Sequence, residues 1–343
     1  MSKDSGSPTM IDVLLLVALP ASGKSEVRTY LKTLGREEQE RAFGWRNPVQ
    51  YDDYPYVEFM RWVDQIARLL GYDPLFYEHP DASFRDPHEW GALIELLNDD
   101  ILGEYRRPAD PAEIARWLFR RLDAAELRAG ARMKLGRLPT DVQEAFVERL
   151  VRSRTAEGMS EARKLLDPER PVIGRVLGDR TVVIEFARGG PHGAPLPYDP
   201  PWGYRYAFSR LCPQALERAS VLYIKVPPVE SRRKNLERAP TGAPGEDSSL
   251  FHAVPMTVML GDYGGDDLEH LMAEDGGASV RIDAHGRSFH LPAAVFDNSD
   301  DITSFVRLVK DPARWSAADK ARLRAALDAG LGRLANLPRR AGS

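Results

Sequence analysis

The chain has 343 residues, 43% hydrophobic and 29% charged, which suits a globular protein with one large domain or a core domain and an insertion. It holds no stretch near the ~20 consecutive apolar residues of a membrane span, and its formal net charge of −4 argues against a nucleic-acid binder, which usually presents a basic domain. Its single cysteine, Cys212, excludes an internal disulfide and fits a reducing environment, so we expect a cytoplasmic protein.

The first predicted element is a buried strand that runs directly into a phosphate-binding loop. Residues 13–17 are all apolar, as in a parallel strand covered on both faces. Residues 18–25, ALPASGKS, fit the Walker A pattern G-x-x-x-x-G-K-[ST] except for an alanine at its first glycine. A secretory signal is the alternative for the apolar run, but Asp4 and Asp12 precede it and cleavage near Ala21 would destroy the loop.

This loop has the residue types that polyphosphate binding needs. Lys24 would neutralise the β- and γ-phosphates of a nucleotide, and the Ser25 hydroxyl would occupy one position on Mg²⁺. A chance Gly-Lys-Ser in a turn is the alternative, but the strand before the loop and the helix predicted after it match the context that the motif requires. Because backbone N–H groups at a helix N-terminus form an anion site, we expect the nucleotide to contact Ala21, Ser22, Gly23, Lys24, Ser25 and Glu26.

A second strand, predicted around residues 48–51, ends in two adjacent aspartates. It follows a helix that we expect to end at about Thr33 and a charged stretch over residues 36–41. Asp52 and Asp53 would lie at the carboxyl end of a strand beside the loop, where open α/β sheets bind their ligands. Alternatively, the two carboxylates cap the next helix.

A long all-helical insertion is predicted after the second strand. Its helix starts are marked by Pro55, by Asp86 and Asp110, each followed by a proline, and by a capping box of Thr140 with Gln143. Apolar residues follow each start at helical spacing. We interpret these stripes as hydrophobic core rather than as cofactor contacts.

The strand pattern returns in the second half of the chain. A third buried strand over residues 181–187 precedes a long loop, which we expect to be functional or mobile. A fourth strand covers residues 221–226, and two prolines open the helix after it. A short fifth strand at residues 293–296 is followed by Ser299, which we expect to cap a helix, and Ser316 is expected to cap the last helix.

Five short apolar strands, with a phosphate-binding loop after the first and helices between them, resemble the P-loop kinase core of nucleotide kinases and polynucleotide kinases. The resemblance covers about half of the chain. It implies an α/β fold with a five-stranded parallel sheet flanked by helices, in which residues 10–53 and 171–337 form the core. Residues 54–170 would be a helical substrate-binding or cap region, and residues 225–250 a lid.

One stretch implies a catalytic base. The segment YDDY at residues 51–54 resembles the polynucleotide-kinase and zeta-toxin branch, where an aspartate after the second strand accepts the proton of the substrate hydroxyl. On that resemblance Asp52 is the base, with Asp53 as the fallback and otherwise a substrate contact, like Arg188. Glu185, at the end of the third strand, would hold Mg²⁺ or pair with Arg188.

Two further stretches extend the resemblance to a lid and a nucleotide loop. The basic cluster after the fourth strand resembles the lid that closes over the transferring phosphate, which implies roles for Arg232 and Arg233 in catalysis and for Arg238 in substrate binding. The alternative is a solvated helix face. The segment FDNSDD resembles the loop that cradles adenine and implies that Asn298 and Ser299 contact the nucleotide, the alternative being a plain turn.

We therefore expect an ATP-dependent kinase that uses ATP and Mg²⁺ and transfers the γ-phosphate to a hydroxyl of a small molecule. The alternatives are a nucleotide-binding ATPase or switch without an acceptor, and a kinase of nucleic-acid 5′-hydroxyl ends. The seven histidines show no metal-ligand spacing, and the acidic turn at residues 262–267 lacks the full calcium-loop pattern, so we predict no structural metal.

Charge along the insertion favours a neutral or amino-bearing acceptor. Residues 55–104 carry three Arg against eleven Asp and Glu, a net charge of −8, whereas residues 105–154 have a net charge of +5. The acidic half directly follows Asp52 and would repel a nucleic-acid strand, because each phosphate contact needs a cation. We expect the acceptor pocket to draw its walls from the aromatic residues of the acidic half, Tyr56, Trp62, Tyr72, Phe76, Tyr77 and Trp90.

Overall fold

A computed structural model of the protein describes residues 10–337 except 104–106, 155–158, 168–179 and 239–252. Its centre is a six-stranded sheet in the order β2-β3-β1-β4-β6-β5. The first four strands and β6 run parallel, and β5 pairs antiparallel with β6. The strands are β1 Val13–Val17, β2 Val49–Asp52, β3 Val182–Phe186, β4 Ala219–Lys225, β5 Ser279–Ala284 and β6 Arg287–Asp297.

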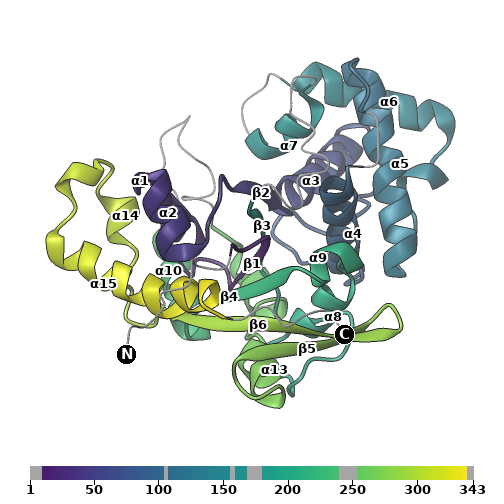
Figure 1. The fold of residues 1–343 in the computed structure, drawn as a ribbon. Coiled ribbons are helices and arrows are strands. Elements are labelled where there is room, and N and C mark those ends of the chain that lie inside the picture. Colours follow the sequence, from purple (N-terminus) through teal and green to yellow (C-terminus); the bar gives the residue numbers. More distant parts are fainter. Residues whose placement is uncertain (1–9, 104–106, 155–158, 168–179, 239–252, 338–343) are drawn as a thin grey trace, which may run out of the picture.

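Helices cover the sheet and form a lobe beside it (Figure 1). The lobe, between β2 and β3, contains α3 Tyr54–Leu69, α4 Glu89–Leu102, α5 Pro111–Ala129, α6 Thr140–Ser153 and α7 Ser160–Leu166, with the 3₁₀ turn η1 Leu135–Arg137. The other helices are α1 Lys24–Thr33, α2 Arg36–Phe43, α8 Gly203–Ser209, α9 Pro213–Leu216, α10 Pro228–Arg238, α12 Met256–Gly261, α13 Leu268–Glu274, α14 Phe305–Leu308, α15 Ala317–Leu327 and α16 Arg333–Ala335, with the 3₁₀ turn η2 Pro312–Arg314 and the π-helical turn η3 Asp328–Gly332. Across the described ranges, no helix combines the length and apolarity that a bilayer crossing requires.

Both faces of the sheet are covered because each strand alternates its side chains between them. In β1, Leu15 and its alternate neighbours pack into a core with α8, α9 and α13. Leu14 and Leu16 pack on the opposite face into a core with α1, α2 and α15. Figure 1 shows α1, α2 and α15 on one side of the sheet and α8 and α13 on the other. The fold is therefore a three-layer α/β arrangement around a mixed sheet.

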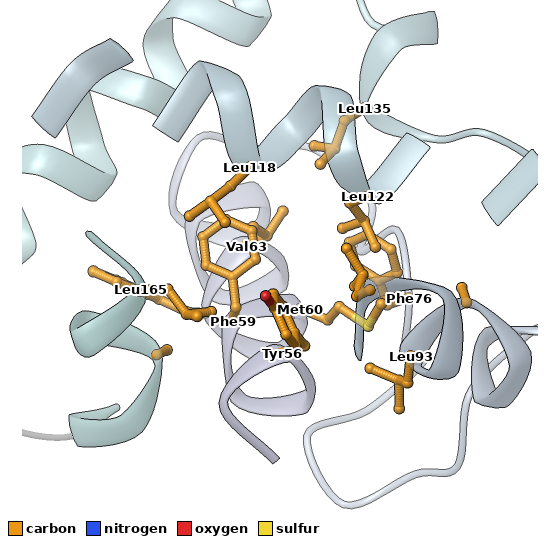
Figure 2. Close-up of a cluster of buried hydrophobic side chains, with 14 of the residues drawn as sticks. Tyr56, Phe59, Met60, Val63, Phe76, Leu93, Leu118, Leu122, Leu135 and Leu165 are labelled. Carbon is orange, nitrogen blue, oxygen red and sulfur yellow. The ribbon is translucent and has the colours of Figure 1, made fainter. Parts of the chain in front are cut away.

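The helical lobe has a hydrophobic core of its own (Figure 2). In α4, Leu93 belongs to this core, whereas the next residue, Ile94, packs against the sheet. The helix α4 thus joins the lobe to the sheet. The boundary that was predicted at residue 170 lies outside the described residues. The core of the lobe gathers the apolar stripes of α3, α5 and α7, among them Phe59, Met60, Val63, Leu118, Leu122 and Leu165.

The predicted five-stranded parallel sheet is wrong in the number and direction of its strands. The strand expected at residues 293–296 is only the end of β6, and β5 is an additional antiparallel edge strand. In β5, the buried residues Val280 and Ile282 alternate with the exposed residues Arg281 and Asp283. That period of two is typical of a half-buried strand, and a search for unbroken apolar runs misses it.

Two predicted helix caps are confirmed. The Asp110 carboxylate accepts hydrogen bonds from the backbone N–H groups of Ala112 and Glu113 at 2.9 and 3.1 Å, and α5 begins at the following proline. The Ser316 hydroxyl accepts from the backbone N–H of Asp319 at 3.0 Å at the start of α15. In both helices the side chain satisfies a backbone donor that has no partner within the helix.

Two other predicted caps are wrong. Thr140 begins α6 without a side-chain cap, because Gln143 donates its Nε2 to the Leu138 carbonyl at 2.8 Å instead of closing a box. Ser299 does not start a helix, because its backbone N–H donates to Asp297 Oδ1 at 2.9 Å and the next helix, α14, lies further along the chain. The backbone donors that these caps would have bonded have other acceptors, because the Gln143 N–H donates to the Pro139 carbonyl at 3.0 Å and the Ile302 N–H donates to Asn298 Oδ1 at 2.8 Å.

Two boundaries also differ from the prediction. The Asp86 carboxylate accepts from the backbone N–H of His88 at 3.0 Å, which forms a turn, and α4 begins after it. The charged stretch at residues 36–41 belongs to α2, whose first turn carries Glu37 and Glu38. Acidic residues at a helix N-terminus complement the helix dipole, so Glu37 and Glu38 were the sequence signal for the start of α2.

Candidate active site

A cleft of about 330 Å³ opens where β1, β2 and β3 end, at the carboxyl edge of the sheet. One part of its lining consists of residues 20–25 with Asp52 and Glu185, which lie opposite each other in the register of β2 and β3. The other part comes from the helical lobe and from residues 253–263. Parallel α/β sheets bind their ligands at this edge, so the cleft is the candidate active site.

The loop between β1 and α1 has the curled backbone of an anion site. Ala21 and Gly23 adopt left-handed φ values of 57° and 103°, and Ser22 Oγ donates to the Leu19 carbonyl at 2.7 Å. A Cβ atom on Gly23 would lie 2.6 Å from Thr303 Oγ1. Glycine is therefore required here both for its conformation and for the close packing of the loop.

Asn298 lies behind this loop and supports it. Its Nδ2 donates to the Ser22 carbonyl at 2.7 Å and to Thr303 Oγ1 at 2.9 Å, and its Oδ1 accepts from the backbone N–H of Ile302 at 2.8 Å. The side chain is fully buried. The structure thus places Asn298 as a prop for the loop, and Ser299 does not line the cleft.

The first turn of α1 offers backbone donors to the cleft. The first backbone bond back to the loop joins the Val27 N–H to the Gly23 carbonyl at 2.9 Å. The N–H groups of Lys24, Ser25 and Glu26 donate to no other group within the described ranges, as the geometry of a helix N-terminus requires. Together with the positive end of the helix dipole, these donors form an anion site.

Lys24 is half-buried beside this site, without an ion-pair partner in the described part of the chain. Its Nζ donates to the carbonyls of Ala18 and Leu19 at 3.3 and 3.4 Å. Burial lowers the pKa of Lys24, and the charges of Glu185 and Asp52 offset that effect only in part. A bound phosphate would supply the counter-charge that this ammonium group lacks.

Asp53 lines the cleft and is held in a buried ion pair. Arg188 Nη1 lies 2.6 Å from Asp53 Oδ2, and Arg188 Nη2 donates to the Trp90 carbonyl at 3.0 Å. The guanidinium also lies over the Trp90 ring, 5.0 Å from its centroid. Arg188 therefore joins the end of β2 to the helical lobe, and it does not itself line the cleft.

Asp52 faces a different environment from its neighbour. Its Oδ1 accepts from the backbone N–H of Tyr54 at 2.8 Å, and no ion pair involves it among the described residues. Burial, with the charges of Glu185 and Asp53, raises the pKa of Asp52 to about 8. A pKa near the working pH suits a general base, because the ionised fraction of such a carboxyl accepts a proton more readily than an ordinary carboxylate does.

Glu185 pairs with Arg28 of α1 rather than with Arg188. Arg28 Nη1 lies 3.0 Å from Glu185 Oε2, and Gln50 Nε2 donates to the same oxygen at 3.2 Å. Ser25 and Glu185 both line the cleft, as a shared Mg²⁺ site requires. No cluster of three or more metal-ligating side chains occurs in the described ranges, so a Mg²⁺ ion here would depend on phosphate and water oxygens as well.

The basic cluster of α10 contains three kinds of position. Arg233 is exposed, and its Nε donates to Glu230 at 2.7 Å, which favours the alternative of a solvated helix face. Arg238 lines the cleft and pairs with Glu26 at 2.7 Å, so Glu26 anchors this arginine. Arg232 is half-buried outside the cleft lining, and its role in closing over a phosphate stays a prediction. Residues 239–250 of the predicted lid lie outside the described residues.

The contacts that dock α10 on the phosphate-binding loop and on Asp301 were not predicted from the sequence. Ser231 Oγ donates to the Pro20 carbonyl at 2.7 Å, and Lys234 Nζ lies 2.8 Å from Asp301 Oδ1. Both residues are buried, and with residues 235 and 238 they form one helical stripe. Polar residues at this spacing, directly after a strand, were the signal that could have found them.

Aromatic side chains form the other wall of the cleft. Tyr77 stacks on Phe84 with ring centroids 4.6 Å apart, and Trp90 meets Phe84 and Tyr263 edge to face at 4.9 and 5.6 Å. Arg61 and Asp262 add charged groups to this wall. Of the six aromatic residues expected as pocket walls, Tyr77 and Trp90 line the cleft, whereas the core of the lobe takes up Tyr56, Trp62 and Phe76 and solvent exposes 44% of Tyr72.

Comparisons of the chain with models of protein families, with curated proteins and with solved structures find no match. The observations that bear on function are therefore those of the cleft itself. It brings together a loop with unused backbone donors, an aromatic wall and two groups, Lys24 and Asp52, that form no ion pair within the described ranges.

Proposed function

We propose that the protein is a P-loop kinase that transfers the γ-phosphoryl group of ATP to a hydroxyl of a small molecule. The observation that carries the proposal is the meeting of Lys24 and Asp52 in one cleft, the first beside unused backbone donors and the second outside any ion pair in the described ranges. Phosphoryl transfer needs little else from a protein, because positioning and charge stabilisation supply most of the catalysis.

The phosphate side of the cleft would bind the nucleotide. Backbone N–H groups of residues 23–26 would donate to the phosphate oxygens, and Lys24 would neutralise charge that builds up in the transition state. Ser25 and Glu185 would hold Mg²⁺, which supplies further neutralisation of the phosphates when bound. Arg238 lines the same side and is fixed by Glu26.

Asp52 would act as the base toward the acceptor. As the acceptor oxygen forms its bond to the γ-phosphorus, the bond from that phosphorus to the leaving oxygen of ADP breaks. The hydroxyl proton passes to the Asp52 carboxylate, whose Oδ1 is already oriented by the backbone N–H of Tyr54. Asp53 is unsuited to this task, because Arg188 holds it as a buried ion pair.

The acceptor side favours a small molecule over a nucleic acid. The cleft has a volume of about 330 Å³, part of which the phosphates would fill, and its acceptor wall is mostly aromatic. A nucleic-acid strand would need several cations along its backbone. Arg61 is the one basic residue that lines the acceptor wall within the described ranges.

We also propose that the protein works in the reducing cytoplasm, because its sequence holds a single cysteine.

A label-transfer assay tests this function. The protein is incubated with Mg²⁺, ATP labelled at the γ-phosphorus, a pool of small hydroxylated metabolites and an oligonucleotide with a free 5′-hydroxyl. We expect the label in a small-molecule product, and no such product from Lys24→Ala. Label found only in inorganic phosphate would favour an ATPase, and efficient labelling of the oligonucleotide a 5′-end kinase, and either result would contradict the proposal.

A further inference from the structure

Two polar atoms on the acceptor wall of the cleft have no hydrogen-bond partner among the described residues. Asp262 lines the cleft and is 2% exposed, and within the described ranges its Oδ2 makes no hydrogen bond. The hydroxyl of Tyr77, which lines the same wall, also has no partner there. Because buried polar atoms are almost always hydrogen-bonded, two such atoms on one wall indicate that a ligand supplies their partners.

Two other buried carboxylates near the cleft, those of Asp64 and Asp53, are satisfied by the protein. Asp64 accepts backbone N–H groups from Leu75 and Tyr77 at 2.6 and 2.7 Å, which fixes the segment that carries Tyr77. Asp53 has its ion pair with Arg188. Asp262 thus differs from these two carboxylates, because within the described ranges it lacks both a cation and a full set of donors.

Arg61, the cation whose charge acts on Asp262, is committed elsewhere. The guanidinium of Arg61 lies 4.2 Å from the centroid of the Tyr77 ring and donates to the Pro80 carbonyl, and no ion pair joins it to Asp262 in the described ranges. The Ser83 hydroxyl gives Asp262 one hydrogen bond, yet burial still raises the pKa of this carboxyl to about 7. A ligand with a positive charge and hydrogen-bond donors would satisfy it.

The backbone holds Asp262 rigidly against the wall. The Gly264 N–H donates to the Gly190 carbonyl at 2.9 Å, and a Cβ atom on Gly189 would lie 2.3 Å from the Gly265 carbonyl oxygen. These contacts clamp the segment that carries Asp262 onto the loop that follows β3, so the carboxylate is placed before a ligand arrives. Preorganised charge of this kind costs the protein little when a ligand binds.

Aromatic rings surround the same region. Phe84 contacts both Tyr77 and Trp90, and Tyr263 directly follows Asp262 in the chain and packs on Trp90. Rings of this kind attract cations, and two of them already do so, because Arg61 lies over Tyr77 and a second arginine over Trp90. An organic ammonium group fits a carboxylate within such a wall better than a neutral or anionic group does.

We propose that the acceptor is a hydroxyl-bearing organic amine, with its ammonium group at Asp262 against the aromatic wall and its hydroxyl toward Asp52. This inference rests on the proposed kinase function, which it deepens by naming the acceptor class. The Tyr77 hydroxyl would provide a second polar contact to the same molecule. The cleft volume of about 330 Å³, shared with the phosphates, limits the acceptor to a compact amino alcohol or amino sugar.

Matched pairs of compounds test the inference. The probes are a panel of amino sugars and aromatic amino alcohols, each beside its N-acetyl counterpart, which keeps the hydroxyls but removes the charge. Binding is measured by calorimetry without nucleotide, and phosphorylated product by mass spectrometry with Mg²⁺ and ATP. At least one amine should bind and react ~10-fold or more better than its N-acetyl partner.

Two variants assign the preference to Asp262. Asp262→Asn keeps the shape and should abolish the amine preference, whereas Asp73→Asn, which removes the same charge from an exposed position of the helical lobe, should retain it. If Asp262→Asn does not fold, the comparison of amine with N-acetyl compound in the parent protein still decides. Equal binding of amine and N-acetyl partners, no binding of any amine, or a preference that survives Asp262→Asn would overturn the inference.

The two readouts separate this inference from the proposed function. Transfer of phosphate to hydroxyl compounds without any preference for amines would overturn the inference and leave the kinase function standing. Amine binding that depends on Asp262, with no phosphorylated product from any compound, would support the amine site and contradict the kinase function.

Discussion

Arg188 Nη1 and Asp53 Oδ2 lie 2.6 Å apart in a buried ion pair that joins the residue after β2 to the chain after β3. This ion pair gives the two adjacent aspartates different roles. Asp53 is committed to holding the strands and the helical lobe together, and Asp52 is left with one backbone hydrogen bond and a raised pKa. Of the two, Asp52 is the group with freedom to exchange a proton.

We expect Asp52→Asn and Asp53→Asn to fail in different ways. Asp52→Asn keeps the shape but removes the base, so phosphoryl transfer should fall ~10²-fold or more while Mg-ATP still binds. Asp53→Asn leaves Arg188 buried without a counter-charge and should lower the free energy of unfolding by about 3 kcal/mol. Turnover assays, nucleotide titrations and denaturant melts of both variants measure this. Full turnover in Asp52→Asn would move the base to another residue.

The raised pKa of Asp52 also predicts how stability depends on pH. The folded protein keeps this carboxyl protonated up to about pH 8, whereas the unfolded chain releases the proton near its ordinary value of 3.8. Stability that comes from the protonated form is therefore present at low pH and is lost as the pH rises through about 8. Asn at this position avoids the loss, so without nucleotide Asp52→Asn should melt above the parent by roughly 5 °C at about pH 8.5 and match it near pH 4. A difference that shrinks as the pH rises would contradict the raised pKa.

Gly23 should tolerate no side chain. Its φ of 103° is strained for any other residue, and an added Cβ would meet Thr303 Oγ1 at 2.6 Å. Gly23→Ala should lower the free energy of unfolding by about 1–3 kcal/mol and abolish nucleotide binding. Gly35→Ala is the matched control, because Gly35 has φ −62° and no atom within 4 Å of an added Cβ, and it should change stability by less than ~0.5 kcal/mol. Normal Mg-ATP affinity in Gly23→Ala would show that the loop does not bind phosphate.

Two arginines of α10 should differ in their effect on turnover. Arg238 lines the cleft, and Arg238→Ala should reduce kcat/KM ~10-fold or more, because it removes a cation from the phosphate side. Arg233→Ala removes exposed ion pairs within one helix and should change kcat/KM less than ~2-fold. A large effect of Arg233→Ala on kcat alone would return it to the predicted role over the transferring phosphate.

The parts of the site that are local in sequence were predictable. The loop and the start of α1 follow from a contiguous motif, and Asp52 and Asp53 follow from the end of a single strand. Contacts between distant segments were not predictable, because a local sequence pattern does not show which residues meet in the fold. Arg188 was expected near substrate, but Asp53, 135 positions away, takes it up as an ion-pair partner. The same holds for Asp262, whose importance depends on the wall that Tyr77 and Trp90 build beside it.

For the fold as well, predictions were correct where the sequence signal is local and wrong where distant contacts decide. Fully buried strands were found from their apolar runs, and the half-buried hairpin of β5 and β6 was missed because only every second residue faces the core. The cap prediction was correct at Asp110, where one side chain decides, and wrong at Ser299, where the Asn298 side chain accepts the N–H that the cap would have bonded. Competition of that kind depends on tertiary contacts, which a local pattern does not contain.

The most direct test of the proposed nucleotide site is a calorimetric titration of Mg-ATP into the parent protein and two lysine variants. Lys24→Ala removes the half-buried ammonium beside the loop, and Lys32→Ala removes an exposed lysine from the same helix. We expect one nucleotide site per chain in the parent and in Lys32→Ala, and an affinity for Mg-ATP that is reduced ~100-fold or more in Lys24→Ala. Equal Mg-ATP affinity in all three proteins, or no binding to the parent, would contradict the claim that this cleft holds a nucleotide.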